Sequence, residues 1–268
     1  MKRSFFLMAF SFACLTGAQA ATMQTIFTDD FTQYAAETDK GKVNTALSKH
    51  GWTTSTGSDF DITADGLTTT QNESGYWAQS KIYTDLGTDN KIQLGTSNST
   101  YQFSFTLKGA SANNQSLFCL AGNDFSLLLG NSYDSSKSIK LGSVAANALN
   151  SNTWYSFQNS SISTTINPDP ASGTEVTIPA SDHTWDYSVT LTTATDGTNT
   201  LSYTVNGTTV TYNFESKSEL TQMGFLQDGG ANGITLKNFT ASKSIPEPTT
   251  ATLGLFGLMA LLARRRRA

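Results

Sequence analysis

The sequence predicts an all-β protein built as an antiparallel β-sandwich. The chain holds 41 Thr and 31 Ser but only 14% charged residues, and threonine and aromatic side chains suit a pleated, half-buried surface. Short runs alternate apolar and polar residues, and Gly, Asn and Asp separate these runs. The 268 residues are enough to bury a substantial core in one large domain.

The strongest strand signals lie between residues 187 and 214. Three runs there alternate with period two, at 187–191, 201–205 and 210–214. Asp196-Gly197 and Asn206-Gly207 separate them, and such pairs favour hairpins because both central residues of a type I′ turn need positive φ. We therefore predict three consecutive antiparallel strands with a two-residue turn at Asn206-Gly207. The alternation also places four side chains on one buried face: Val189, Leu191, Tyr203 and Val205.

The remaining elements are weaker but follow the same pattern. Six further runs have the composition of strands: 66–70, 76–83, 100–107, 116–120, 125–129 and 234–240. Helical periodicity is scarce, and the segments 34–50 and 216–223 are each predicted to hold one short helix. Many short strands with turn signals between them are typical of a sandwich or barrel.

The hairpin sequence Leu201–Gly207 resembles the one found in the laminin-G/concanavalin A-like jelly-roll superfamily. Two other segments, 27–31 and 236–240, look like the first and last strands of such a domain, which lie side by side and seal the sheet. The resemblance covers residues 25–242. It implies a jelly-roll domain at 21–244.

The N-terminus has the pattern of a secretory signal peptide at 1–20. Positive charge at Lys2 and Arg3 precedes an apolar run, and Ala18 and Ala20 supply the small residues that signal peptidase reads. Cleavage is expected after Ala20. An uncleaved anchor and lipidation of Cys14 are the alternatives.

The C-terminal segment 245–268 predicts a membrane helix at about 249–263, followed by a basic cluster of Arg264, Arg265, Arg266 and Arg267. The apolar stretch 251–263 reaches about 20 Å as a helix, against about 30 Å of hydrocarbon. The arginines would stay in the cytoplasm and stop transfer, which leaves the long N-terminal part outside. A short membrane anchor is the simplest interpretation.

This end of the chain resembles the PEP-CTERM sorting signal of Gram-negative bacteria. Pro246, Glu247 and Pro248 form the motif, and the short helix and the arginines follow in the same order. The resemblance implies processing by an exosortase. The precursor would lie in the inner membrane, and the product would reach the cell surface or the extracellular polymer.

Charge excludes one class of partner. Between Ser4 and Ala263 the chain has 11 Lys, no Arg and, with Glu247 set aside, 20 acidic residues, a formal charge of −9. Nucleic-acid binding needs cationic side chains to neutralise phosphates. We therefore predict no nucleic-acid partner.

No catalytic residue is predicted. Glycan hydrolases on this kind of fold carry paired carboxylates on one strand, and the domain's glutamates show no such motif: Glu37, Glu73, Glu175, Glu215 and Glu219. Carboxylates brought together from distant strands remain the alternative. Cys119, the cysteine left after signal removal, has apolar neighbours that favour burial.

Two candidate ligand sites remain. Asp59, Asp61 and Asp65 offer oxygen ligands that suit Ca²⁺, with a solvated turn as the alternative. Trp77 and Trp154 each adjoin a tyrosine, so strand alternation would expose one ring of each pair for stacking on a sugar. Core packing is the alternative for both rings.

Together these features predict an exported cell-surface or extracellular-matrix protein that is not an enzyme. Its expected role is carbohydrate binding, adhesion or support of extracellular polymer. A secreted glycan hydrolase or lyase and a scaffold without ligand are the alternatives. No cofactor other than calcium is expected, and the expected ligand is a glycan.

Overall fold

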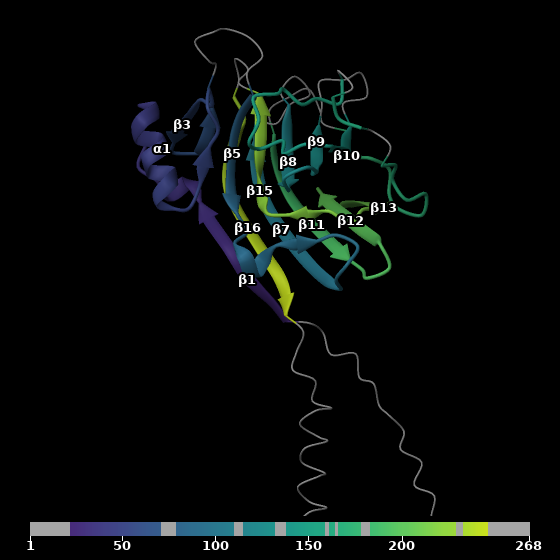
Figure 1. Ribbon diagram of the computed structural model, residues 1–268. Helices are drawn as coiled ribbons and strands as arrows, with labels where there is room; N and C mark the ends of the chain where they lie inside the picture. Colours follow the sequence, from purple (N-terminus) through teal and green to yellow (C-terminus); the bar gives the residue numbers. More distant parts are fainter. Residues whose placement is uncertain are drawn as a thin grey trace, which may run out of the picture. The chain divides into compact units, whose positions relative to one another are not determined.

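The computed structural model describes residues 22–70, 79–109, 115–131, 138–158, 161–163, 166–177, 183–228 and 233–245. Within these residues the chain is an antiparallel β-sandwich, as predicted (Figure 1). Residues 23–244 form one compact unit. The predicted signal peptide with Ala18 and Ala20, the predicted sorting motif Pro246–Pro248 and the arginine cluster lie outside the described residues.

The larger sheet has eight strands among the described residues, in the order β13-β12-β11-β7-β16-β4-β3, with β1 beside β16. Their bounds are β1 (Thr22–Asp30), β3 (Phe60–Thr63), β4 (Gly66–Thr69), β7 (Ser99–Lys108), β11 (Thr184–Thr193), β12 (Thr198–Val205), β13 (Thr208–Glu215) and β16 (Thr235–Ile245). The pairing of β1 with β16 confirms the expected contact of first and last strands. Thr28 Oγ1 lies 3.0 Å from Thr240 Oγ1 across this pair.

The smaller sheet has six described strands in the order β10-β9-β8-β15-β5-β2. Their bounds are β2 (Thr53–Thr54), β5 (Gln79–Asp85), β8 (Ser116–Ala121), β9 (Ser126–Asn131), β10 (Ile139–Val144) and β15 (Gln222–Asp228). A further short pair consists of β6 (Ile92–Gln93) and β14 (Glu219–Leu220). The described residues also contain two single-turn 3₁₀ helices, η1 (Phe31–Gln33) and η2 (Thr88–Asn90), and one α-helix.

That helix, α1 (Lys40–Lys49), confirms the helix predicted within 34–50. Asp39 caps it, because its carboxylate accepts a hydrogen bond from the Lys42 amide at 3.1 Å. The helix predicted at 216–223 is wrong. These residues form β14 and the start of β15, because pairing with β6, β5 and β8 overrides the local preference.

The hairpin of β12 and β13 turns as predicted. Asn206 and Gly207 have φ angles of 49° and 80°, so both occupy the left-handed region that a type I′ turn requires. The connection at Asp196-Gly197 differs, since only Gly197 has positive φ, at 97°. The four residues predicted to share a core face are all fully buried: Val189, Leu191, Tyr203 and Val205.

Aromatic rings fill the centre between the two sheets. Phe105 of β7 stacks on Tyr187 of β11 with ring centroids 4.6 Å apart. From the smaller sheet, Phe118 and Phe225 approach Phe105 at 5.3 and 5.0 Å. Offset and edge-on contacts of this kind are favoured by the ring quadrupoles, and they add to the stabilisation from burial.

One layer further along, this core contains unpaired polar groups. Gln227 of β15 lies opposite Ser116 of β8, two residues beyond the pair Phe225 and Phe118, and both are buried. Neither amide atom of Gln227 nor the Ser116 hydroxyl has a hydrogen-bond partner within the described structure. Buried polar groups without partners destabilise a fold.

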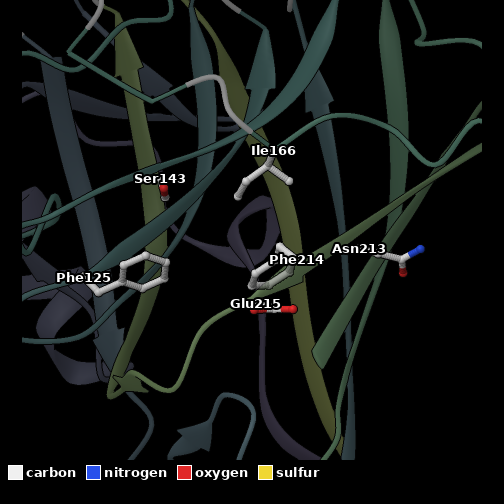
Figure 2. Close-up of a pocket in the computed structure, with 6 residues that line it drawn as sticks. All are labelled: Phe125, Ser143, Ile166, Asn213, Phe214 and Glu215. Carbon is white, nitrogen blue, oxygen red and sulfur yellow. The ribbon is translucent and has the colours of Figure 1, made fainter. Parts of the chain in front are cut away.

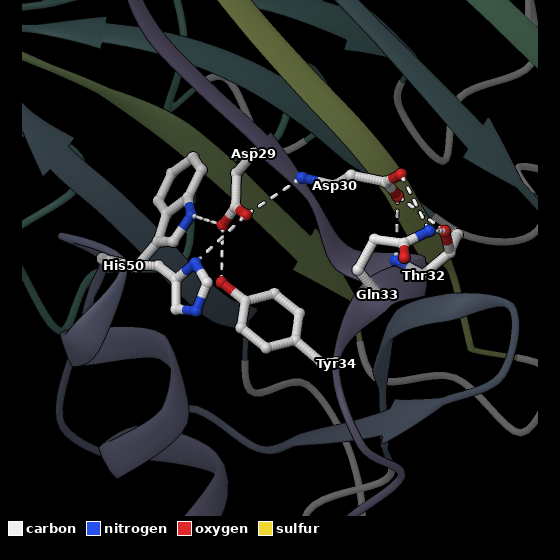
Figure 3. Close-up of polar contacts among 7 residues, drawn as sticks. Asp29, Asp30, Thr32, Gln33, Tyr34 and His50 are labelled. Carbon is white, nitrogen blue, oxygen red and sulfur yellow. Dashed lines mark hydrogen bonds and ion pairs between the residues drawn. The ribbon is translucent and has the colours of Figure 1, made fainter.

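A buried carboxylate ties β1 to the region around α1. Asp29 accepts hydrogen bonds at 2.6 Å from the Tyr34 hydroxyl and from the Trp52 indole N–H, and His50 Nδ1 lies 3.5 Å from it (Figure 3). Neighbouring Asp30 holds η1 by accepting from the Thr32 amide at 3.0 Å. These contacts give Asp29 and Asp30 structural roles.

The outer face of the smaller sheet is covered by residues 146–158, which we call the cover segment. The sheet and the cover segment together form a second apolar cluster: Tyr83, Leu117, Cys119, Ala121, Leu128, Val144, Ala148, Leu149, Tyr155, Phe157, Ile162 and Leu226. Polar side chains of the sheet hold the cover segment in place. The ammonium of Lys81 donates to three of its carbonyl oxygens, and Gln79 hydrogen-bonds both backbone groups of Tyr155 at 2.8 Å.

Among the described residues, no helix is long and apolar enough to cross a membrane. The predicted membrane helix at 249–263 lies outside that part of the chain.

Candidate functional site

The outer face of the larger sheet is polar and carries few charges. Outward positions on its five neighbouring strands include these: Thr100, Gln102, Ser104, Thr106, Lys108, Thr184, Asp186, Ser188, Thr190, Thr192, Thr198, Thr200, Ser202, Thr204, Thr209, Thr211, Asn213, Glu215, Asn238, Thr240, Ser242 and Ser244. Many hydroxyls bond across strands, as Ser202 does with Thr211 at 2.8 Å. Within the described part of these five strands, no aromatic side chain occupies an outward position.

The two carboxylates on that face are far apart. Asp186 lies near one end of β11, and Glu215 ends β13 at the opposite end. The strand register separates them by eight residues along the strands, about 26 Å at 3.3 Å per residue. Glycosidase carboxylates stand about 5–10 Å apart, so this pair does not have that geometry.

A hollowed region lies instead at the side of the sandwich, between the edge strands β10 and β13. Residues 166–177, which we call the side segment, run between these two edges. The Asp169 amide donates to the Thr211 carbonyl at 2.7 Å, and the Ile139 amide donates to the Val176 carbonyl at 2.9 Å. The side segment therefore joins both sheets and covers edges that would otherwise be free to pair with another chain.

The first hollow, of about 250 Å³, lies where the side segment begins. Its lining is Phe125, Ser143, Ile166, Asn213, Phe214 and Glu215. Figure 2 shows the rings of Phe125 and Phe214 on either side, Ile166 above them and the Glu215 carboxylate below. Apolar walls with a few polar groups are typical of small-molecule sites. The volume of this hollow is smaller than that of pockets for drug-sized ligands, which is roughly 300–1,000 Å³.

The second hollow, of about 220 Å³, adjoins the first, because Ile166 lines both. Its other lining residues are Lys140, Leu141, Asn167, Pro168 and Glu175. Its lining carries side chains of both charges, Lys140 and Glu175. The Glu175 carboxylate lies 3.4 Å from the Tyr212 hydroxyl, which restricts its position.

Two buried tyrosines contact β10 and the side segment from the core. The Tyr203 hydroxyl donates to the Ile139 carbonyl at 3.2 Å and accepts from the Val176 amide at 3.4 Å. The Tyr212 hydroxyl lies 3.4 Å from both the Ile139 carbonyl and the Glu175 carboxylate, which share its one hydrogen. Burial raises the pKa of Tyr203 to about 12 and raises that of Tyr212 further. Both phenols therefore stay neutral, and they act as fixed hydrogen-bond donors beneath the second hollow.

The structure does not gather the three aspartates proposed for calcium. Asp59 is buried and forms an ion pair with Lys40 at 2.9 Å, whereas exposed Asp65 pairs with Lys108. Within the described residues no group of three or more His, Cys, Asp or Glu side chains is placed to hold a metal ion. Asp59 and Asp65 are thus each paired with a lysine.

Asp61 is distinctive among the carboxyls. It is half-buried on β3, and desolvation raises its pKa, with the nearby Asp59 charge adding to the effect and Lys40 opposing it. A carboxyl with a raised pKa beside a second carboxylate is a feature that acid catalysis uses.

The other predicted positions are placed as follows. Trp77 lies outside the described residues. Trp154 is half-buried within the cover segment, on the opposite face of the smaller sheet from the core. Cys119 is fully buried, as predicted, and burial raises its thiol pKa to about 12. An exposed reactive thiol is therefore not present at Cys119.

Sequence reasoning missed the two hollows. Phe125 and Phe214 are 89 positions apart in the chain, and neither adjoins a motif. One sequence signal did point to this region. Phe214 continues the inward alternation of Val210 and Tyr212, but it stands near the end of β13, where its ring is only half-buried.

The chain matches no known family model and no curated protein sequence. It is similar to several solved structures. The CBM2 module of Lactobacillus casei BL23 phage J-1 evolved Dit has a TM-score of 0.48 and 10% identity, covering 84% of this chain and 98% of that one. The Emp47p carbohydrate recognition domain has a TM-score of 0.46 and 11% identity, covering 85% and 100%.

An enzyme is also among the similar structures. An alginate lyase Aly36B mutant in complex with alginate trisaccharide has a TM-score of 0.46 and 12% identity, covering 82% of this chain and 98% of that one. The proteins with this degree of similarity thus include both binding domains and an enzyme. The site must be judged from its own residues.

Proposed function

We propose that this protein is an exported, noncatalytic glycan-binding protein of the bacterial cell surface or extracellular polymer. We infer that its domain is a laminin-G/concanavalin A-like jelly roll, and that an exosortase sorts it through Pro246, Glu247 and Pro248. The pairing of first and last strands supports the jelly roll. The order of proline motif, apolar stretch and arginines supports the sorting.

The first hollow carries the binding proposal. Two half-buried phenylalanine rings, Phe125 and Phe214, offer apolar faces for the C–H face of a sugar ring. Ser143 and Glu215 line the same hollow with a hydroxyl and a carboxylate, groups that hydrogen-bond sugar hydroxyls. A cavity of about 250 Å³ accommodates roughly one such ring.

A glycan array followed by titration calorimetry tests the proposal. The purified protein should bind at least one glycan, and both Phe214→Ala and Glu215→Gln should weaken that binding at least tenfold. Asp186→Asn is the matched control for Glu215→Gln, because it neutralises an exposed carboxylate far from the hollow. Loss of binding in the control, or full binding in both hollow variants, would reject the site.

A glycan-active hydrolase or lyase is the second candidate, and Asp61 is the observation that favours it. Its raised pKa and its closeness to Asp59 suit a general acid. If the protein cleaves a polysaccharide and Asp61→Asn abolishes cleavage without lowering thermal stability, the noncatalytic proposal is wrong. The control is Asp65→Asn, which changes an exposed carboxylate on the same hairpin.

A further inference from the structure

We propose that the two hollows are neighbouring subsites for one linear glycan, so that the ligand is a disaccharide or longer. This inference rests on the proposed function, because it assigns a second sugar ring to the hollow beside the first. It also states the class of ligand: an oligosaccharide or polysaccharide chain, and not a free monosaccharide.

The two hollows are continuous at Ile166. Among the described residues, Ile166 is the one that lines both hollows. Ser143 lines the first hollow and Leu141 and Lys140 line the second, and these residues lie on the same strand, β10. Two to three residues along a strand correspond to roughly 7–10 Å, a step that two linked sugar rings can span.

Both hollows are small. The volumes are about 250 and 220 Å³, so neither hollow reaches the lower end of the pockets that hold drug-sized ligands, about 300 Å³. Each hollow accordingly holds roughly one ring. A ligand that fills both must extend along the side of the sandwich past Ile166.

The two hollows offer different groups to a sugar. The first combines the rings of Phe125 and Phe214 with the Glu215 carboxylate. Among its described residues the second has no aromatic ring, and it supplies the Asn167 amide and the Glu175 carboxylate, which hydrogen-bond hydroxyl groups. The Glu175 carboxylate lies 3.4 Å from the Tyr212 hydroxyl.

The subsites also lie on a supported surface. Hydrogen bonds join the side segment to β13. The Asp169 amide donates to the Thr211 carbonyl, and the Asn213 side-chain amide donates to the Asp169 carboxylate at 2.8 Å. The side segment is bound to β10 at Val176. Both ends of the double hollow are thus fixed to strands, which lowers the ordering cost of binding.

An array of defined mono-, di- and trisaccharides tests the inference on the full protein. It carries glucose, galactose, mannose, N-acetylglucosamine and glucuronic acid, each alone and in β- and α-linked oligomers. We expect at least one disaccharide to bind tenfold or more tightly than its own monosaccharide, with a smaller gain for the trisaccharide. Asn167→Ala should reduce that disaccharide-to-monosaccharide ratio towards one, whereas Asp186→Asn should leave the ratio unchanged.

The outcomes separate the two proposals. If no sugar binds in any form, the glycan-binding function itself is rejected. If a monosaccharide binds and its disaccharide binds equally well, the function stands and the second subsite is rejected. An Asn167→Ala variant that keeps the full ratio also rejects the second subsite, provided that circular dichroism shows the same fold as the unaltered protein.

Discussion

Replacing Lys81 by Met should destabilise the protein strongly through the cover segment. The Lys81 ammonium donates to the carbonyl oxygens of Ala148, Ser151 and Thr153 at 2.9, 2.6 and 2.9 Å. Methionine fills much of the same volume but leaves these three acceptors without their donor. Each buried acceptor left unpaired costs about 1–3 kcal/mol, and some rehydration is expected, so we estimate a total loss of about 3 kcal/mol.

Thermal unfolding measures this effect directly. For a domain of 150–250 residues, 1 kcal/mol shifts Tm by about 2–4 °C, so Lys81→Met should lower Tm by about 6–12 °C. Lys91→Met is the matched control, because Lys91 pairs with Glu219 at 2.9 Å on the surface and such pairs contribute about 1 kcal/mol or less. Equal shifts in the two variants would refute the argument that the buried ammonium holds the cover segment.

The same lysine predicts a pH dependence. Burial lowers the pKa of Lys81 to about 8, from 10.5 for an exposed lysine. Between these values the unfolded chain binds more protons than the folded chain, so this group makes stability rise with pH. Urea unfolding from pH 7 to 10 should show a smaller rise, or a steeper fall, in Lys81→Met than in the unaltered protein. Identical pH profiles would contradict this assignment.

The remaining predictions concern the core and the chain ends. Gln227→Met should raise Tm by about 2–8 °C, because it removes a buried amide that has no partner in the described structure, worth about 1–2 kcal/mol; a lower Tm would show that the amide is paired. N-terminal sequencing of the exported protein should read from Ala21, and an intact Met1 would reject the signal peptide. Changing Pro246 and Pro248 to Ala should make the precursor accumulate in the inner membrane of an exosortase-bearing host, since helix could then extend through the motif; normal processing would favour a plain anchor.

Local chemistry made part of the fold predictable. The turn at Asn206-Gly207 depends on two residues that tolerate positive φ, and the alternating runs beside it depend only on which side chains prefer the core. Helix α1 has its own cap at Asp39 and its own apolar positions at Val43 and Leu47. Each of these features is encoded within a few neighbouring residues, so the sequence could be interpreted correctly there.

Pairing between distant segments decided the cases that failed. Residues 216–223 have a helix-like composition, but Leu220 pairs with Ile92 and Met223 with Thr84 and Leu120. Similarly, Asp59, Asp61 and Asp65 have a spacing that suits calcium. In the folded chain, however, Asp59 pairs with Lys40 and Asp65 pairs with Lys108, and no local sequence pattern connects these lysines to the aspartates.

By itself, the sequence determined the β class, the hairpin of β12 and β13, the burial of Cys119 and the absence of a charge pattern for nucleic acid. Each follows from composition or from the conformational preferences of adjacent residues. Only the tertiary structure decided where a ligand could bind. The two hollows form where β10, β13 and the side segment meet, and Phe125, Ile166 and Phe214 come together there because the edges of two different sheets are closed by one connecting segment.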